Sequence, residues 1–326
     1  MRGVNENGRG RGLSVVGPLS LEKDVEGVRR GLGLTLAPVY DEGTIVIDNL
    51  IAAAALLRRP SLEAHKEALR ILEDDGLLSF QRWEGVHNSN THNLSNPRRQ
   101  HVNGLIKRLL REHPPESGVS FCEMGTGMGV DLVYASQYLD GQVVGIDSSD
   151  SAVRRCVDRF KMVHQVGKMP NRVQLMVGNY MNWMKERDEE GQRLDMIYGY
   201  SSLHYQSPMV LRDETFPLLA RVLSPGDRFS KPGILAFSMK TARSASAKSN
   251  RQLRLTEGKY KPSIDMEDMM FRIYPRDMRA VLDLVEPSFE VLGSHLARRS
   301  GYDVTGETEY FAELILTPRL NNGKSR

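Results

Sequence analysis

The chain has 326 residues, of which 40% are hydrophobic and 26% are charged, and its formal net charge is +3. This composition is typical of globular proteins, the length is enough for two domains, and the net charge is too small to indicate nucleic-acid binding by itself. No apolar run reaches the roughly 18 residues of a membrane helix, so no membrane partner is expected. Two cysteines, Cys122 and Cys156, are too few for a disulfide framework and favour a reducing, cytoplasmic location.

The N-terminal third of the chain is predicted to be mainly helical. Residues 1–15 are rich in Gly and Arg and lack the apolar region of a secretory signal, so we interpret them as a disordered tail. Residues 16–115 are interpreted as a helical cap. Apolar residues recur at helical spacing over 48–57 and 62–72, and Ser61 is a suitable N-cap for the second of these helices.

Three histidines lie near the end of this cap, just before a further predicted helix over residues 102–110. His87, His92 and His101 are not paired at a spacing that places two ligands on one helix face, and no thiolate accompanies them. No metal site is therefore predicted.

A glycine-rich segment follows the first predicted strand. The apolar residues before and after Glu123 lead directly into Gly125, Gly127 and Gly129. Glycine allows positive φ and a close approach of the backbone to a ligand. The third glycine comes one residue too early for the Gly-x-Gly-x-x-Gly fingerprint of dinucleotide-binding proteins. Two interpretations remain: a loop that binds a nucleotide-like cofactor, and a glycine-rich turn without a ligand.

A second apolar strand is predicted over residues 142–147, about twenty residues beyond the glycines. It ends at Asp147, whose carboxylate is placed to accept hydrogen bonds from ribose hydroxyls. The alternative is that Asp147 and the following Ser148 belong to the cap of the next helix, and both roles can coexist.

The third and fourth predicted strands also end in polar residues. The strand over 173–177 is followed by Asn179, whose amide can both accept and donate hydrogen bonds. The strand over 194–198 leads to His204. In an open α/β sheet ligands bind outside the carboxyl ends of the strands, and histidine is the commonest general base. The alternative for His204 is a structural or substrate-orienting histidine.

Taken together, the Glu-x-Gly-x-Gly-x-Gly loop, the acidic end of the second strand and the Ser-x-x-Leu-His segment after the fourth strand resemble class I (Rossmann-like) S-adenosylmethionine-dependent methyltransferases, in particular the small-molecule branch. The sequence departs from the family at Asn179, where an aspartate usually accepts from the adenine amino group, and at residues 227–232, which lengthen a tight turn. The cofactor-binding residues that the resemblance implies are Glu123, Gly125, Thr126, Gly127, Gly129, Asp147, Ser148, Gly178, Asn179, Tyr180, Tyr200 and Ser201. The implied catalytic residues are His204 and Tyr205.

The resemblance also implies the fold. It covers residues 117–318 and predicts a doubly wound α/β domain over 116–320, followed by a disordered tail over 321–326. The expected sheet has seven mostly parallel strands and an antiparallel C-terminal hairpin. Its last elements are predicted as a strand over 233–238, a helix over 275–285, and a closing pair of strands over 289–292 and 310–316.

The implied reaction is methyl transfer from S-adenosylmethionine to oxygen, nitrogen or carbon of a small molecule. This is an in-line displacement, so the protein must align the acceptor, exclude water and in some cases remove a proton, for which His204 is the candidate. The N-terminal cap would act as a lid over the cofactor. Candidate residues of that lid are Tyr40, Trp83, His92 and Arg99.

Two alternatives stay open. An RNA or protein methyltransferase would use two basic stretches, Arg98 to Arg111 and Lys240 to Lys261, as a docking surface; otherwise these stretches are a solvated helix face and a surface loop. A non-catalytic cofactor-binding partner protein would leave His204 without a role. The oligomeric state and the acceptor are not predicted.

Overall fold

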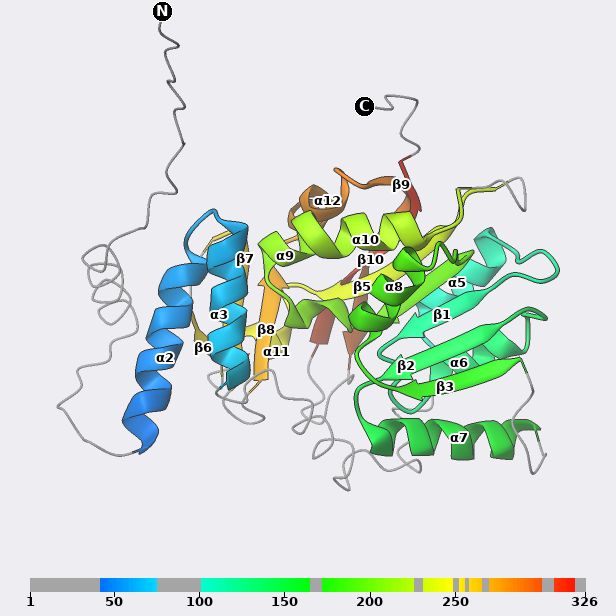
Figure 1. Cartoon of the computed structure of the whole chain (residues 1–326), viewed down its shortest axis with the longest axis horizontal. Helices are drawn as coiled ribbons and strands as arrows, with labels where there is room; N and C mark the ends of the chain where they lie inside the picture. The colour runs from blue at the N-terminus through cyan, green and yellow to red at the C-terminus, as the bar shows by residue number, and fades with distance from the viewer. Residues whose placement is uncertain are drawn as a thin grey trace, which may run out of the picture.

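The computed structural model describes residues 42–74, 101–164, 172–225, 231–248, 252–255, 258–265, 270–300 and 308–319. They form a main sheet with helices on both faces and a second, smaller sheet to one side (Figure 1). The strands of the main sheet are β1 Phe121–Met124, β2 Val143–Asp147, β3 Val173–Val177, β4 Met196–Tyr200, β5 Ile234–Lys240, β9 Phe289–Ser300 and β10 Thr308–Pro318.

The main sheet has seven strands in the order β3-β2-β1-β4-β5-β10-β9. The first five are parallel, and β10 pairs antiparallel with both β5 and β9. This confirms the predicted doubly wound sheet with an antiparallel C-terminal hairpin. The strand order reverses between β1 and β4, which is where ligands bind in such sheets.

Side chains alternate between two cores because successive residues of a strand point to opposite faces. In β1, Cys122 and Met124 belong to one core, and Phe121 belongs to the other. The first core is shared with α8 Tyr180–Glu189, α10 Phe216–Val222 and α12 Met278–Val285. The second core is shared with α5 Gly104–Glu112, α6 Val130–Ser136 and α7 Asp150–His164.

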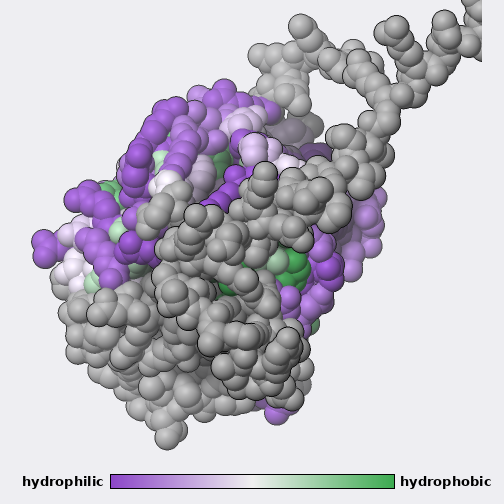
Figure 2. Space-filling model, turned by 90° about the vertical axis from the view of Figure 1, so that its left-hand side faces the viewer, coloured by the Kyte–Doolittle hydropathy of each residue, from purple (hydrophilic) through white to green (hydrophobic). Residues whose placement is uncertain are grey.

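The predicted N-terminal helices are present as α2 Glu42–Leu57 and α3 Leu62–Asp74. Ser61 Oγ accepts from the backbone N–H of Ala64, as expected for an N-cap. Buried apolar residues of this pair, such as Ile51 and Leu72, belong to the same core as α10 and α12. The helices lie beside the smaller sheet, and the coloured part of the molecular face on that side is mostly hydrophilic with small apolar areas (Figures 1 and 2). None of the helices in the described ranges has the length and apolar composition needed to cross a bilayer.

The smaller sheet was not predicted. Strands β6 Gln252–Arg254, β7 Tyr260–Asp265 and β8 Met270–Pro275 form it in the order β6-β7-β8, with antiparallel pairs. The interpretation of residues 240–261 as a surface loop is therefore wrong for the described part, which includes the end of β5, helix α11 Ala245–Lys248, β6 and the start of β7.

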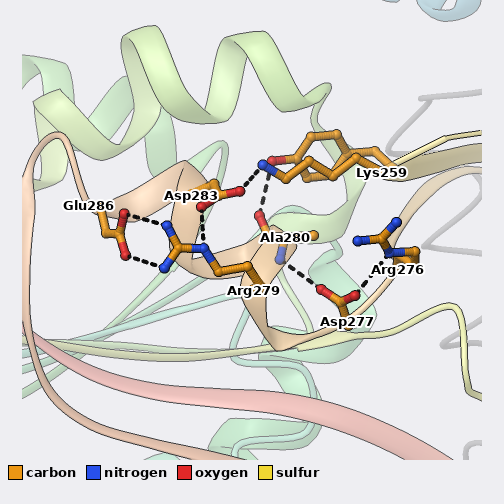
Figure 3. A network of polar contacts seen from close by, with 8 residues as sticks. Lys259, Arg276, Asp277, Arg279, Ala280, Asp283 and Glu286 are labelled. Atoms are coloured by element: carbon orange, nitrogen blue, oxygen red, sulfur yellow. Dashed lines mark hydrogen bonds and ion pairs between the residues drawn. The ribbon is translucent and has the colours of Figure 1, made fainter.

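Helix α12 is attached to the smaller sheet through polar contacts at the surface (Figure 3). Lys259, just before β7, pairs with Asp283, and the hydroxyl of Tyr260 donates to the carbonyl of Ala280 at 2.9 Å. The helix begins after Asp277, whose Oδ1 accepts from the N–H of Ala280 at 3.0 Å. These contacts hold the smaller sheet against the helix that precedes β9.

The segment after β4 contains three short helices. They are η3 Leu203–Tyr205, α9 Pro208–Val210 and the π-helix η4 Leu211–Thr215, which leads into α10. Helix α3 packs against α9, and η3 packs against both β5 and β8. The residues after β4 thus contact the N-terminal helices on one side and the smaller sheet on the other.

Candidate cofactor and acceptor site

The glycine loop after β1 has the backbone conformation that requires glycine. The φ angles of Gly125, Gly127 and Gly129 are 70°, 52° and 71°, a region that other residues rarely adopt. A Cβ on Gly125 would lie 2.9 Å from Cβ of Ser202, and a Cβ on Gly129 would lie 2.1 Å from Sγ of Cys156. Glycine at position 125 therefore lets the loop after β4 pack closely against the glycine loop. Glycine at position 129 lets helix α7 pack closely, so its role is in packing.

Asp147, at the end of β2, forms hydrogen bonds with the residues that follow β1 and β3. Its Oδ2 accepts from the N–H of Gly127 at 2.7 Å and its Oδ1 from the N–H of Ser149 at 2.9 Å. Its carbonyl accepts from the N–H of Gly178 at 2.8 Å. Ser149 Oγ in turn accepts from the N–H of Ala152 in the first turn of α7. The turn and cap role of Asp147 is thus present, and each carboxylate oxygen still has a lone pair for a ribose hydroxyl.

Two residues that follow β3 also form hydrogen bonds within the fold. Asn179 is the N-cap of α8, and its Oδ1 accepts from the N–H of Met181 at 2.8 Å. The hydroxyl of Tyr180 donates to the carbonyl of Ser202 at 2.9 Å. Burial raises the pKa of Tyr180 to about 12, so this phenol remains protonated. The contact between Tyr180 and Ser202 joins the end of β3 to the end of β4, so the predicted residues lie around one site.

Several polar atoms after β4 are buried and have no hydrogen-bond partner among the described residues. Ser201 has a φ of 57°, a strained conformation for a residue with a side chain, and its N–H donates to Ser238 Oγ at 3.1 Å. In the part of the chain that is described, Ser201 Oγ, Ser202 Oγ and His204 Nδ1 accept or donate no hydrogen bond. A buried polar atom without a partner costs free energy and is often satisfied by a ligand or water.

His204 lies between the main sheet and the smaller sheet. Its side chain is 3% exposed, and its ring centroid is 4.1 Å from that of Tyr205. Burial, together with the positive charges of Arg272 on β8 and Lys240 on β5, lowers the pKa of His204 well below 6.5. The imidazole is therefore neutral at neutral pH, with Nδ1 as a potential hydrogen-bond or proton acceptor.

Glu123 is a buried carboxyl directly below the glycine loop. Its side chain is 3% exposed and accepts a hydrogen bond from the backbone N–H of Leu132, while Oε2 has no partner among the residues that the structure describes. Burial, followed by the negative charges of Asp131 and Asp147, raises the pKa of Glu123 well above 4.5.

Asp131, in the first turn of α6, is the centre of a buried polar network that was not predicted. It accepts from the backbone N–H of Asn103 at 2.8 Å, from the Asn103 side chain, and from the hydroxyl of Tyr198 at 2.6 Å. Arg299 on β9 donates to Asn103 Oδ1 and to Glu313 Oε1, and its guanidinium lies 4.7 Å from the ring centre of Tyr200. The network connects the glycine-loop helix to the C-terminal hairpin.

The only signal for this network in the sequence is the acidic residue in the first turn after the glycines. Asn103, Tyr198 and Arg299 are separated from their partners by 28, 67 and 196 residues. Two cations that act on His204 were not predicted either: Lys240 is the last residue of β5, just beyond the predicted strand over 233–238, and Arg272 lies on β8, a strand that was not predicted.

Some predicted residues contribute differently or cannot be placed. Thr126 Oγ1 donates to the carbonyl of Ile146 at 3.2 Å, inside the fold, and Ser148 follows the end of β2 at the rim of the site. The proposed lid residues Tyr40, Trp83, His92 and Arg99 lie outside the described residues. Within the described ranges no three His, Cys, Asp or Glu side chains come together as metal ligands.

The strand order, the glycine loop and the acidic end of β2 define a Rossmann-like domain that binds a nucleoside-containing cofactor at the carboxyl ends of its strands. Residues 121–226 match a family model described as a methyltransferase domain. Residues 121–226 are thus a methyltransferase domain.

Solved methyltransferase structures are similar to the chain. They include a SAM-dependent methyltransferase from Anabaena variabilis (15% identity, 74% of this chain and 95% of that chain, TM-score 0.47). Another is magnesium protoporphyrin IX methyltransferase from Synechocystis with bound SAH (16% identity, 76% and 99% covered, TM-score 0.46). A third is geranyl diphosphate methyltransferase in complex with GPP and sinefungin (16% identity, 66% and 76% covered, TM-score 0.43). The search of curated proteins found no match. At these values the similar structures give no information about the acceptor of this chain.

The residues present fit S-adenosylmethionine. The three glycines of the loop place no side chain between their backbone and a ligand, and Asp147 lies beside the loop, where its Oδ2 accepts from the N–H of Gly127. Glu123 Oε2, which has no partner among the described residues, places a carboxyl close to the loop. This carboxyl can ionise when a cofactor with a net positive charge binds beside it.

Proposed function

We propose that the chain methylates a small-molecule acceptor and that the acceptor binds beside His204. The observation that carries this proposal is the position of His204: a neutral, buried imidazole at the end of β4, with Nδ1 unsatisfied by any described residue. Ser202, two residues earlier, contacts the glycine loop. This contact brings the segment that carries His204 close to the cofactor loop, where a group that takes part in methyl transfer must lie.

In this proposal the cofactor is held by the predicted residues at the ends of four strands. The backbone of the glycine loop and Glu123 bind the methionine part, Asp147 and Ser148 the ribose, and the segment from Gly178 to Tyr180 the adenine. Tyr200 and Ser201 complete the pocket near the methyl group. When bound, the cofactor would supply the methyl group from its sulfonium: the methyl–sulfur bond breaks, its electron pair stays on sulfur, and S-adenosylhomocysteine is the leaving group.

His204 Nδ1 would accept the proton of an acceptor hydroxyl, or orient a nitrogen or carbon acceptor through a hydrogen bond. A neutral imidazole can accept a proton, and its lowered pKa means that this ability is lost only as the pH falls below its usual range. Tyr205, whose ring is tilted by 39° against that of His204 at a centroid distance of 4.1 Å, would fix the orientation of the imidazole.

The two basic stretches give the alternative of an RNA or protein acceptor less support than His204 gives the small-molecule proposal. Arg108 is 3.6 Å from Glu313, and Lys240 is 3.8 Å from Glu309. Both carboxylates are buried. Positive charges that are neutralised by buried carboxylates do not form the exposed basic patch that phosphate contacts require.

The N-terminal helices would complete the acceptor pocket, with residues 16–115 as a cap and 116–320 as the catalytic domain. Helix α3 contacts the segment after β4 through α9, and Lys66 of α3 pairs with Glu214 of the π-helix. Movement of these helices would therefore be transmitted to the residues next to His204.

Two measurements test the proposed function. Release of S-adenosylhomocysteine, measured with panels of small hydroxyl, amine and carbon-acid acceptors, should reveal turnover, whereas structured RNA and peptides should give none. Once an acceptor is known, His204→Asn should reduce kcat by about 100-fold or more, the size of a general-base contribution. The affinity for the cofactor should change by no more than a few fold.

The matched control is His295→Asn, which changes an exposed histidine on β9 and should have wild-type activity. An unchanged rate and pH profile in His204→Asn would remove His204 from the mechanism. Turnover that occurs only with RNA or protein, and weakens steeply with added salt, would contradict the small-molecule proposal.

A further inference from the structure

The short helix η3, which carries His204, is held in place at both of its ends. The carbonyl of Ser202, immediately before η3, accepts from the hydroxyl of Tyr180 at 2.9 Å. Gln206, immediately after η3, forms side-chain hydrogen bonds with Tyr180 and with Thr215. A helix as short as η3 has poor backbone hydrogen bonding of its own. These side-chain contacts therefore largely decide where it lies.

The hydrogen bonds of Tyr180 and Gln206 can run in only one direction. The hydroxyl of Tyr180 has a single proton, which it donates to the carbonyl of Ser202. The amide of Gln206 must therefore be the donor in its bond with Tyr180, through Nε2. Oε1 of Gln206 is left to accept from Oγ1 of Thr215. The four residues form one chain in which each side chain donates to the next, from Thr215 through Gln206 and Tyr180 to Ser202.

The elements that contribute to this chain of hydrogen bonds are anchored in the first core. Thr215 is the last residue of the π-helix η4 and is buried, and the next residue, Phe216, belongs to the first core. Tyr180 is the first residue of α8 and packs against the same core. Single π-helical turns are rare and occur frequently at functional sites. Gln206 thus connects the helix that carries His204 to two elements that the core holds fixed.

The imidazole of His204 depends on these contacts for its position. No residue in the described part of the protein forms a hydrogen bond with its Nδ1. Tyr205 contacts the imidazole ring, but Tyr205 belongs to η3 and moves with it. Ser202, which contacts the glycine loop at Gly125, is the residue whose carbonyl Tyr180 holds. The distance between Nδ1 and the cofactor loop therefore depends on how η3 is held.

We propose that Gln206 is a positioning residue for methyl transfer, because it fixes η3 and so directs Nδ1 of His204 toward the acceptor. This role rests on the proposed function of His204 as a base or orienting group. A displacement of about 1 Å at a reacting group can reduce a rate by about 100-fold. Tyr180 is also proposed to bind the adenine, so Gln206 is the residue of the chain whose substitution separates positioning from cofactor binding.

The first experiment needs no acceptor. The imidazole nitrogen resonances of His204 are recorded by NMR on the full chain with S-adenosylhomocysteine bound, and they are identified by their loss in His204→Asn. In Gln206→Leu, which keeps a side chain of similar volume but removes its hydrogen bonds, these resonances should shift or broaden. The matched control is Gln142→Leu, which changes an exposed residue just before β2 and should leave them unchanged. Unchanged His204 resonances in Gln206→Leu would overturn the proposal.

A double-mutant cycle with a known acceptor shows whether Gln206 acts through His204. Gln206→Leu should reduce kcat by about 10-fold or more, while the affinity for S-adenosylhomocysteine, measured by calorimetry, changes by less than about threefold. In a protein that already carries His204→Asn, the same substitution should reduce kcat by less than about twofold, because the group that Gln206 positions is absent. Equal reductions of kcat in both backgrounds would overturn the proposal.

Gln206→Glu is a second variant, in case Gln206→Leu does not fold. A protonated carboxyl at this position can donate to Tyr180 and accept from Thr215 as the amide does, whereas an ionised carboxylate can only accept. The kcat of this variant should therefore approach that of the wild type as the pH falls toward 4.5, and it should fall by about 10-fold relative to the wild type as the pH rises to 8.5. A ratio of the two kcat values that stays constant over this range would overturn the proposal.

The positioning role and the proposed function can fail separately. Turnover that depends on His204, together with unchanged imidazole resonances in Gln206→Leu, would leave the proposed function intact and overturn the role of Gln206. Shifted resonances in a protein that methylates no small molecule would show that Gln206 fixes His204 and would overturn the proposed function.

Discussion

Two polar networks of similar composition lie in very different surroundings. One lies at the surface, just before β7 and along α12 to its C-cap, and connects Lys259, Arg279, Asp283 and Glu286 (Figure 3). The other is buried and connects Asn103, Asp131, Tyr198, Arg299 and Glu313. Exposed ion pairs contribute little because water and salt screen them, whereas a buried polar group that loses its partner is expensive. The two networks should therefore respond very differently to the same substitution.

The largest effect is expected from removing residues 1–112. This truncation deletes Asn103 and Arg108 from the buried network, and it also deletes the buried side chains of α2, α3 and α5 from both cores. The remaining chain should fail to unfold cooperatively, as measured by thermal denaturation and circular dichroism. A truncated protein with the melting temperature and activity of the full chain would show that the N-terminal helices are dispensable.

A large but more local effect is expected from Asp131→Ala. The substitution leaves the N–H and side-chain amide of Asn103 and the hydroxyl of Tyr198 without their acceptor in a buried position. The free energy of unfolding should fall by about 3 kcal/mol. Chemical denaturation measures this change, and Asp283→Ala is the control because Asp283 accepts two cations at the surface. Equal losses in both variants would contradict the distinction between the networks.

The difference between local and long-range contacts also explains which parts of the fold could be predicted from the sequence. The β-strands, the glycine loop and the amphipathic helices depend on local patterns, and residues 173–177 were predicted with the observed bounds of β3. The smaller sheet was missed because the Lys, Arg and Ser of residues 240–261 suggest a loop, and the partners that fold it, such as Ala280 and Asp283, come later in the chain. The buried network was missed for the same reason. Contacts between distant residues leave no periodicity in the sequence.

A smaller effect, opposite in sign, is expected from Glu123→Gln in the absence of cofactor. In the folded protein the pKa of Glu123 is raised, whereas in the unfolded chain it returns to about 4.5. The stability that this group contributes is thus fully present below pH 4.5 and is lost as the pH rises through the folded-state pKa. The Gln variant, which does not titrate, should melt at a higher temperature than the wild type at pH 8 and lose this advantage near pH 5. Differential scanning calorimetry at both pH values measures the difference. A wild type that is the more stable protein at pH 8 would contradict the prediction.

The smallest effect is expected from Asp283→Asn in the surface network. Asp283 pairs with Lys259 and with Arg279, whose side chains are 41% and 65% exposed. The free energy of unfolding should change by less than about 1 kcal/mol, because exposed pairs gain little Coulomb energy and restrict flexible side chains. The difference between the variant and the wild type should shrink further when the salt concentration is raised from 0.05 M to about 0.5 M, since the Debye length then falls to a few ångströms. Urea denaturation at the two salt concentrations measures both values. A loss of several kcal/mol that persists in high salt would mean that Lys259 and Asp283 hold the smaller sheet against α12 much more strongly than their exposure indicates, and the smaller sheet would then depend on this contact for its position beside His204.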